Sequence, residues 1–217
     1  MSKKDIVLGS VEIIGKTIVS SIPIGGTLIT CVWDAVKSGC LEKRQKQWME
    51  RLEKRLANVE TTLDDLGENN LFTTALVKAT ELAMKTSREE KLDYLANGVA
   101  NSLSSDLDEE KLMVFLDLLD RYTISHIKII YFFNQPRRFE SAESYLRSMG
   151  SPKTPLFHVY PELNNELFPK IYKDLYFDGM VTLENLNMTM TGTGMVAKRT
   201  TSIADEFLKF ILQSDDM

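Results

Sequence analysis

The pattern of hydrophobic and charged positions has one long uncharged interval near the beginning of the chain. Residues 17–33 carry no charge, and this interval contains Pro23 and the pair Gly25 and Gly26. Its length is close to the minimum for one membrane-spanning helix, roughly 17 to 25 residues, but a proline and two glycines disfavour a single straight span. The pattern therefore predicts a helical hairpin, with helices over 5–21 and from residue 27, that either packs internally or enters a bilayer. Its membrane-insertion candidates are Ile18, Val19, Ile22, Ile24, Leu28, Ile29 and Trp33.

The second helix is predicted to continue to residue 66 through a charge-dense stretch. Apolar residues recur there at spacings of three, four or seven, which is typical of a coiled-coil-like seam buried against another helix or another copy of the chain. The self-association candidates are Trp48, Leu52, Leu56, Val59 and Leu63. Residues 42–55 contain six Lys or Arg against three Glu. Lys43, Arg44 and Lys46 are thus candidates for contact with anionic lipid head groups, although a solvated outer face of a packed helix explains the same charges.

In the rest of the chain, the hydrophobic pattern predicts an array of helices. The C-terminal part has a different pattern, in which helices alternate with extended segments. Short-linked helices are expected from residue 70 to residue 122, and the apolar run TISHIKIIYFF predicts a buried helix. Next come a helix over 162–176, an extended stretch over 181–185, the polar tip NMTMTGTG, the extended run MVAKRTT and a final helix over 202–213. This is the order of a winged-helix unit.

The predicted fold is therefore mainly α. It consists of an N-terminal helical hairpin and long helix (1–66), a central helical bundle (67–122) and a C-terminal winged-helix-like domain with a small β-wing (123–217).

Composition narrows the class of protein. The 217 residues are 43% hydrophobic and 26% charged, which is typical of a globular protein. The formal net charge of −5 disfavours nonspecific binding to nucleic acid. Cys31 and Cys40 would lie on opposite faces of one helix, so a reducing cytoplasm is expected. Glu12 and Lys16 interrupt the stretch where a secretory signal needs a clean apolar core.

No pattern in the sequence is typical of catalysis. His126 and His158 lie in different predicted elements and outside any metal-binding motif, and His126 is expected in the core. The TGTG stretch ending at Gly194 lacks the Gly-Lys-Ser/Thr of a phosphate loop and is interpreted as the wing tip. We therefore predict a non-enzymatic protein without catalytic residues, metal or cofactor. Lys198 and Arg199 on the predicted wing are candidates for phosphate contact.

Residues 76–211 resemble the bacterial abortive-infection alpha proteins. The segments that carry the resemblance are LVKATELAMKTSREEKLDYLANGVANSL, DRYTISHIKIIYFFNQP, IYKDLYFDGMV and TTSIADEFLKFI. The resemblance implies a non-enzymatic effector or sensor in defence against phage, in which an infected cell stops growing or dies. The stretch 138–161 departs from the family pattern, and no individual functional residue is carried over.

The leading functional prediction is an antiphage effector in the cytoplasm, peripheral to or inserted in the inner membrane. A phage or host protein would trigger release of the hairpin onto the anionic membrane surface, and the long helix would form a homo-oligomer. Two alternatives stay open. One is a winged-helix regulator that binds DNA, a less favoured partner, and the other is an oligomeric scaffold.

Overall fold

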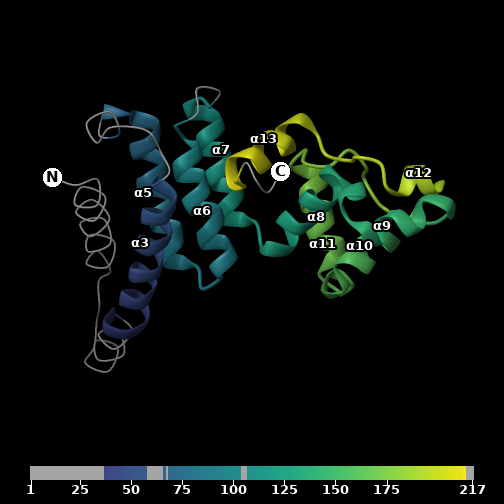
Figure 1. The fold of residues 1–217 in the computed structure, drawn as a ribbon, viewed down its shortest axis with the longest axis horizontal. Helices are drawn as coiled ribbons and strands as arrows, with labels where there is room; N and C mark the ends of the chain where they lie inside the picture. The colour runs from purple at the N-terminus through teal and green to yellow at the C-terminus, as the bar shows by residue number, and fades with distance from the viewer. Residues whose placement is uncertain (1–36, 58–65, 67, 104–106, 214–217) are drawn as a thin grey trace. The chain divides into compact units, whose positions relative to one another are not determined.

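A computed structural model of the chain describes residues 37–57, 66, 68–103 and 107–213 (Figure 1). The chain divides into two compact units, which are treated separately. Unit 1 is Met1–Arg121 with Phe210–Met217, and unit 2 is Tyr122–Lys209. The predicted hairpin lies outside the described residues, and so do the insertion candidates and two seam residues: Ile18, Val19, Ile22, Ile24, Leu28, Ile29, Trp33, Val59 and Leu63.

Unit 1 is a helical bundle, which the sequence predicted for residues 67–122; the described part of the predicted long helix belongs to the same unit. Its elements are a π-helical turn η1 (Lys37–Leu41) and the helices α3 (Glu42–Leu56), α5 (Asn70–Lys85), α6 (Glu89–Asn101) and α7 (Glu109–Arg121). The four helices lie side by side (Figure 1). Asn69 caps α5, because its side chain accepts a hydrogen bond from the Phe72 amide at 2.9 Å. Within the described residues, no helix has the length and apolar character needed to cross a membrane.

The seam of α3 faces the interior of unit 1. Trp48, Leu52 and Leu56 follow one another at four-residue spacing and are all buried, with Trp48 fully inaccessible to solvent. Helix α3 packs on α5 and α6 of the same chain, and the Trp48 indole donates to Thr80 Oγ1 at 3.1 Å. The structure thus corrects the assignment of these three residues to self-association, because their surface is already occupied. Formation of a homo-oligomer stays a prediction, and it would require a different surface of the chain.

The end of helix α13 (Ser202–Ile211) packs on α6 within unit 1. The last carbonyls of a helix have no partner inside it, and two amides one turn apart on α6 supply the missing donors. Asn97 Nδ2 donates to Ile211 O at 2.8 Å, while Asn101 Nδ2 donates to Phe210 O and Leu212 O at 2.9 and 3.1 Å. The Phe210 ring lies directly over Gly98, where an added Cβ would approach it to 2.8 Å.

Unit 2 is also built from helices, most of them short. In chain order they are α8 (Ile124–Asn134), η2 (Pro136–Arg138), α9 (Glu140–Glu143), η3 (Ser144–Arg147), α10 (Lys153–Val159), η4 (Pro161–Leu163), α11 (Phe168–Phe177) and α12 (Gly192–Met195), followed by the start of α13. Helix α8 is the buried helix expected from TISHIKIIYFF, since His126, Ile127, Ile129, Ile130, Phe132 and Phe133 are all buried.

The prediction of a β-wing is wrong. The described residues contain no strand, only two isolated antiparallel bridges, Val181 with Thr200 and Gly150 with Met190. The expected pairing stops after one bridge because the Arg199 amide donates to Phe133 O in α8 instead of continuing a ladder. The expected tip forms α12, whose Gly192 lies so close to η3 that an added Cβ would stand 2.0 Å from Leu146 O. A winged-helix unit is therefore not supported.

Both ends of α11 follow from particular residues. Pro169 lies in the first turn, where its missing N–H is not needed. Gly179 adopts φ 70° just after the helix. Its amide donates to Tyr176 O at 3.0 Å, and the Met180 amide donates to Leu175 O at 2.8 Å. This is a Schellman motif, and it turns the chain back along the helix it has just left.

Candidate functional site

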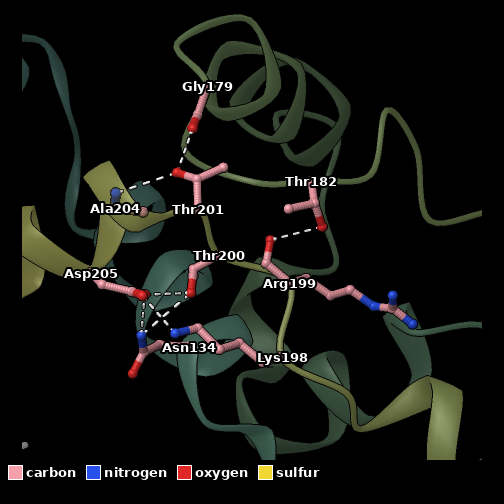
Figure 2. Close-up of polar contacts among 9 residues, drawn as sticks. All are labelled: Asn134, Gly179, Thr182, Lys198, Arg199, Thr200, Thr201, Ala204 and Asp205. Atoms are coloured by element: carbon pink, nitrogen blue, oxygen red, sulfur yellow. Dashed lines mark hydrogen bonds and ion pairs between the residues drawn. The ribbon is translucent and has the colours of Figure 1, made fainter.

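A compact polar cluster joins the start of α13 to α8 (Figure 2). The Asp205 carboxylate accepts from Asn134 Nδ2 at 2.6 Å and from Thr200 Oγ1 at 2.7 Å, and Lys198 Nζ lies 2.5 Å from its other oxygen. Partial burial alone would raise the pKa of Asp205, but the bonds from Lys198, Thr200 and Asn134 outweigh burial and lower it. The cluster is thus a satisfied structural network. Nearby, Thr201 Oγ1 donates to Gly179 O at 2.6 Å and ties α13 to the end of α11.

The structure separates the two cations that the sequence grouped as phosphate contacts. Lys198 is turned toward Asp205, whereas the Arg199 side chain points away from this cluster (Figure 2). Arg199 Nη2 donates to Gly194 O at 2.8 Å and lies 3.2 Å from Met190 Sδ. Its Nε is buried without a hydrogen-bond partner. Lys198 and Arg199 therefore do not point toward a common phosphate site. The DNA-binding alternative relied on a wing and on this pair of cations, and neither is supported.

The basic residues of α3 differ in what they contact. Arg44 Nη1 donates to Met84 O at 2.9 Å, so this cation caps the last turn of α5. Lys46 is exposed and stands 4.0 Å from Glu50 within the same helix. Lys43 is exposed at the start of the helix. Of the three candidates for lipid contact on α3, Lys43 and Lys46 thus present their charge to solvent, whereas Arg44 is bound to α5.

His126 is buried, as the sequence predicted, and it closes the N-terminus of α8. Its Nδ1 accepts from the Thr123 amide at 3.1 Å, so in the neutral ring the proton is on Nε2, which lies 3.8 Å from Asp174 Oδ2. The ring stacks on Tyr122 with a centroid distance of 4.8 Å. Burial lowers the pKa of His126, and the Asp174 carboxylate offsets part of that effect. No group of three or more metal-ligating side chains occurs in the described part of the chain.

Unit 2 contains a groove of about 270 Å³ along α11. One wall is formed by two neighbouring rows of α11 side chains at four-residue spacing, and the other by residues 184–187, with Lys153 of α10 at one end. The lining residues are Lys153, Phe168, Pro169, Tyr172, Lys173, Tyr176, Phe177, Glu184, Asn185, Leu186 and Asn187. Phe177 is 71% exposed, so one aromatic ring of this wall is open to solvent.

Hydrogen bonds hold the second wall in place. The Tyr172 hydroxyl donates to Leu183 O at 3.0 Å, Ser151 Oγ donates to Leu186 O, and Lys153 Nζ donates to Asn187 Oδ1. Burial raises the pKa of Tyr172 well above its usual range, so the phenol keeps its proton and remains a donor. Residues 184–187 are therefore anchored to α10 and α11 although they contain no regular secondary structure. The walls are preformed, which lowers the entropic penalty of binding.

The sequence analysis missed this groove. The helix over 162–176 was interpreted only as part of a winged-helix unit. The signal was present in the spacing of Phe168, Tyr172 and Tyr176, with Lys173 and Phe177 beside them. The opposite wall had no such signal, because residues 184–187 were expected in a strand and in the wing tip.

Comparison of the chain with protein-family models, with curated proteins and with solved structures finds no match.

Proposed function

We propose that this chain is a non-enzymatic binding protein whose unit 2 receives an extended segment of another protein in the groove along α11. The observation that carries the proposal is the apolar wall of α11, which ends in the exposed Phe177 and faces a polar, hydrogen-bonded wall. An apolar surface with a few polar groups at its edge is the usual composition of a binding groove. Its volume, about 270 Å³, lies at the lower end for small-molecule sites, roughly 300 to 1,000 Å³, and suits one or two side chains of a peptide.

The resemblance to abortive-infection proteins supports a biological setting for this binding. We propose that the groove senses a phage or host protein during infection and that the N-terminal segment produces the response. The uncharged interval 17–33, followed by the exposed Lys43 and Lys46, supports action of that segment on the inner membrane.

Recognition is tested by selecting peptides from a random twelve-residue display library on the full chain. Binding of selected peptides is then measured by fluorescence anisotropy for the wild type, Phe177→Ser and Val77→Ser. Val77 is the matched control, because it is an exposed apolar residue (44%) on α5. Burying a phenylalanine is worth about 1.5–3 kcal/mol, so Phe177→Ser should weaken binding at least about tenfold while Val77→Ser leaves it unchanged. Selected peptides that bind both variants equally would refute the groove.

The response is tested separately with the full chain and Ile24→Asp. We expect the wild type to sediment with vesicles that contain anionic lipid and to halt growth when expressed, and the variant to do neither. If the wild type never sediments with such vesicles and the variant is as toxic as the wild type, membrane action is wrong. Phage plating on cells that express the wild type or Phe177→Ser tests the defence setting. Protection by the wild type alone would support it, and absence of protection against every phage tested would oppose it.

A further inference from the structure

We infer that the segment received by the α11 groove is acidic, with Asp or Glu side chains flanking an apolar anchor. This inference rests on the proposed function and adds the chemical class of the partner. The cations around the groove, the neutral character of their partners and the few open aromatic faces support it.

Lys173 is the first of these cations. It is exposed on the α11 wall, and its Nζ lies 5.3 Å from the centroid of the Phe177 ring. Lys128, Lys170 and Lys198 of the same unit each form an ion pair with a carboxylate. Lys173 has no carboxylate within ion-pair distance among the described residues, although it stands only three positions after Lys170. Its charge is thus available to a ligand beside the most exposed aromatic ring of the groove.

Lys153 is the second cation, at the α10 end of the groove. Its Nζ donates to the amide oxygen of Asn187, a neutral group, and lies 5.9 Å from the centroid of the Phe168 ring. The bond fixes the position of the ammonium group without cancelling its charge. A carboxylate that approached the groove would therefore meet a positive group with a defined position, which is favourable for charge-assisted hydrogen bonding.

Arg199 adds positive charge close to the α11 wall. Its described partners are also uncharged, namely the Gly194 carbonyl and the Met190 sulfur. Burial raises the pKa of Tyr172, and the positive charge of Arg199 partly opposes that rise. Glu184 is the one carboxylate in the lining. It would repel acidic side chains from its own position, so the acidic positions of the ligand should lie toward Lys153 and Lys173.

The aromatic side chains favour a peptide over a nucleobase. Stacking of a base needs an open ring face, but Phe168 and Tyr172 are only 5% and 4% exposed and stack on each other with centroids 5.9 Å apart. Phe177 is open, but Lys173 already lies over its ring. An aliphatic or aromatic side chain needs only contact with ring edges and with the apolar wall. The groove thus provides apolar contact and positive charge but no free platform for stacking.

The experiment extends the peptide selection to the charge of the groove. Libraries are selected on the full chain as wild type and as the Lys153→Glu/Lys173→Glu double variant. We expect wild-type binders to carry net negative charge around an apolar residue, and double-variant binders to lose or reverse that bias. One wild-type binder is then measured against Lys173→Glu and Arg137→Glu. Arg137 is exposed on η2 and absent from the groove lining, so it is a charge-matched control.

Lys173→Glu should weaken binding about tenfold and Arg137→Glu less than about twofold, and the difference should shrink at high salt. Binders that depend on Phe177 but show no charge bias and equal affinity for both variants would overturn the acidic class while leaving the groove intact. If no binder depends on Phe177, the proposed function itself fails. Preference for a single-stranded oligonucleotide over every selected peptide, lost with Lys173→Glu, would also overturn the inference.

Discussion

The Tyr172 hydroxyl donates a hydrogen bond of 3.0 Å to the Leu183 carbonyl oxygen and so connects the two walls of the α11 groove. Tyr172 lies in the middle of the helix wall, and Leu183 directly precedes the irregular wall at 184–187. The position of the second wall depends on a side chain of the first. A change at this bond should therefore alter both stability and binding.

Tyr172→Phe tests this connection. The substitution removes one partly buried hydrogen bond, so the free energy of unfolding should fall by about 0.5–1.5 kcal/mol. Affinity for groove-dependent peptides should fall as well, because residues 184–187 lose an anchor. Tyr176→Phe is the control, since Tyr176 lines the same groove and its hydroxyl has no hydrogen-bond partner in the described part of the chain. Urea unfolding and anisotropy measure the two effects, and equal behaviour of the two variants would contradict the role of the bond.

His126 should make stability depend on pH. Burial lowers its pKa below the ordinary value of 6.5, so the unfolded chain takes up a proton at a higher pH than the folded chain. Stability is therefore greatest above about pH 6.5 and falls as the pH drops through the folded-state pKa. Protonation of Nδ1 also removes the acceptor for the Thr123 amide. Asp174, Asp178 and Lys170 are the charged groups that act on the ring.

The measurement is the thermal unfolding midpoint between pH 5 and pH 8 for the wild type and His126→Gln. The wild-type midpoint should decrease below about pH 6.5, and the decrease should be smaller in the variant, whose side chain does not titrate. Parallel curves for the two proteins would show that another group is responsible.

Gly192→Ala tests the contact that replaces the expected wing. The new methyl group would stand 2.0 Å from Leu146 O and 2.5 Å from Tyr145 O, both backbone atoms that cannot move independently. We expect a loss of about 1–3 kcal/mol in the free energy of unfolding, as for other overpacked sites. Gly39→Ala is the control, because nothing lies within 4 Å of the position of its added Cβ. A neutral effect at Gly192 would contradict the close packing of α12 on η3.

Asn97→Ala tests the capping of α13 by α6. Asn97 is buried, and its Nδ2 donates to Ile211 O, so the variant leaves that carbonyl without this donor. We expect a loss of about 1–2 kcal/mol and faster hydrogen exchange in the last turn of α13. Exchange rates that are unchanged in this turn while the rest of unit 1 exchanges faster would mean that Asn97 acts only through general packing.

The helices could be predicted where local sequence determines them. TISHIKIIYFF is apolar all round and forms the buried α8, and Gly179 ends α11 because a left-handed residue is needed there. Helix α5 begins at Asn70, as expected, and Asn69 caps it. One boundary shifted where neighbouring residues compete. The predicted helix over 162–176 begins only at Phe168, because Pro161 and Pro169 favour separate starts.

Features that depend on distant partners could not be predicted. The spacing of Trp48, Leu52 and Leu56 shows that α3 has an apolar face, but not whether α5 and α6 or a second chain covers it. The predicted wing had suitable turn residues. However, Gly192 packs on η3, and Met190 pairs with Gly150. Each contact joins residues more than 35 positions apart, so the local sequence gives no indication of it. The groove is formed by α11 and by a wall without regular secondary structure. The sequence pattern could therefore indicate only the α11 wall.

The amide pair on α6 has a consequence for the order of events during protein synthesis. Asn97 and Asn101 belong to the first half of the chain, but the carbonyls that they bind belong to Phe210, Ile211 and Leu212. All of Tyr122–Lys209 is translated between them. Domains commonly fold one after another as they leave the ribosome, but unit 1 cannot complete its contacts until unit 2 has emerged. A nascent chain that stalls within unit 2 would therefore expose the α6 surface that receives Phe210.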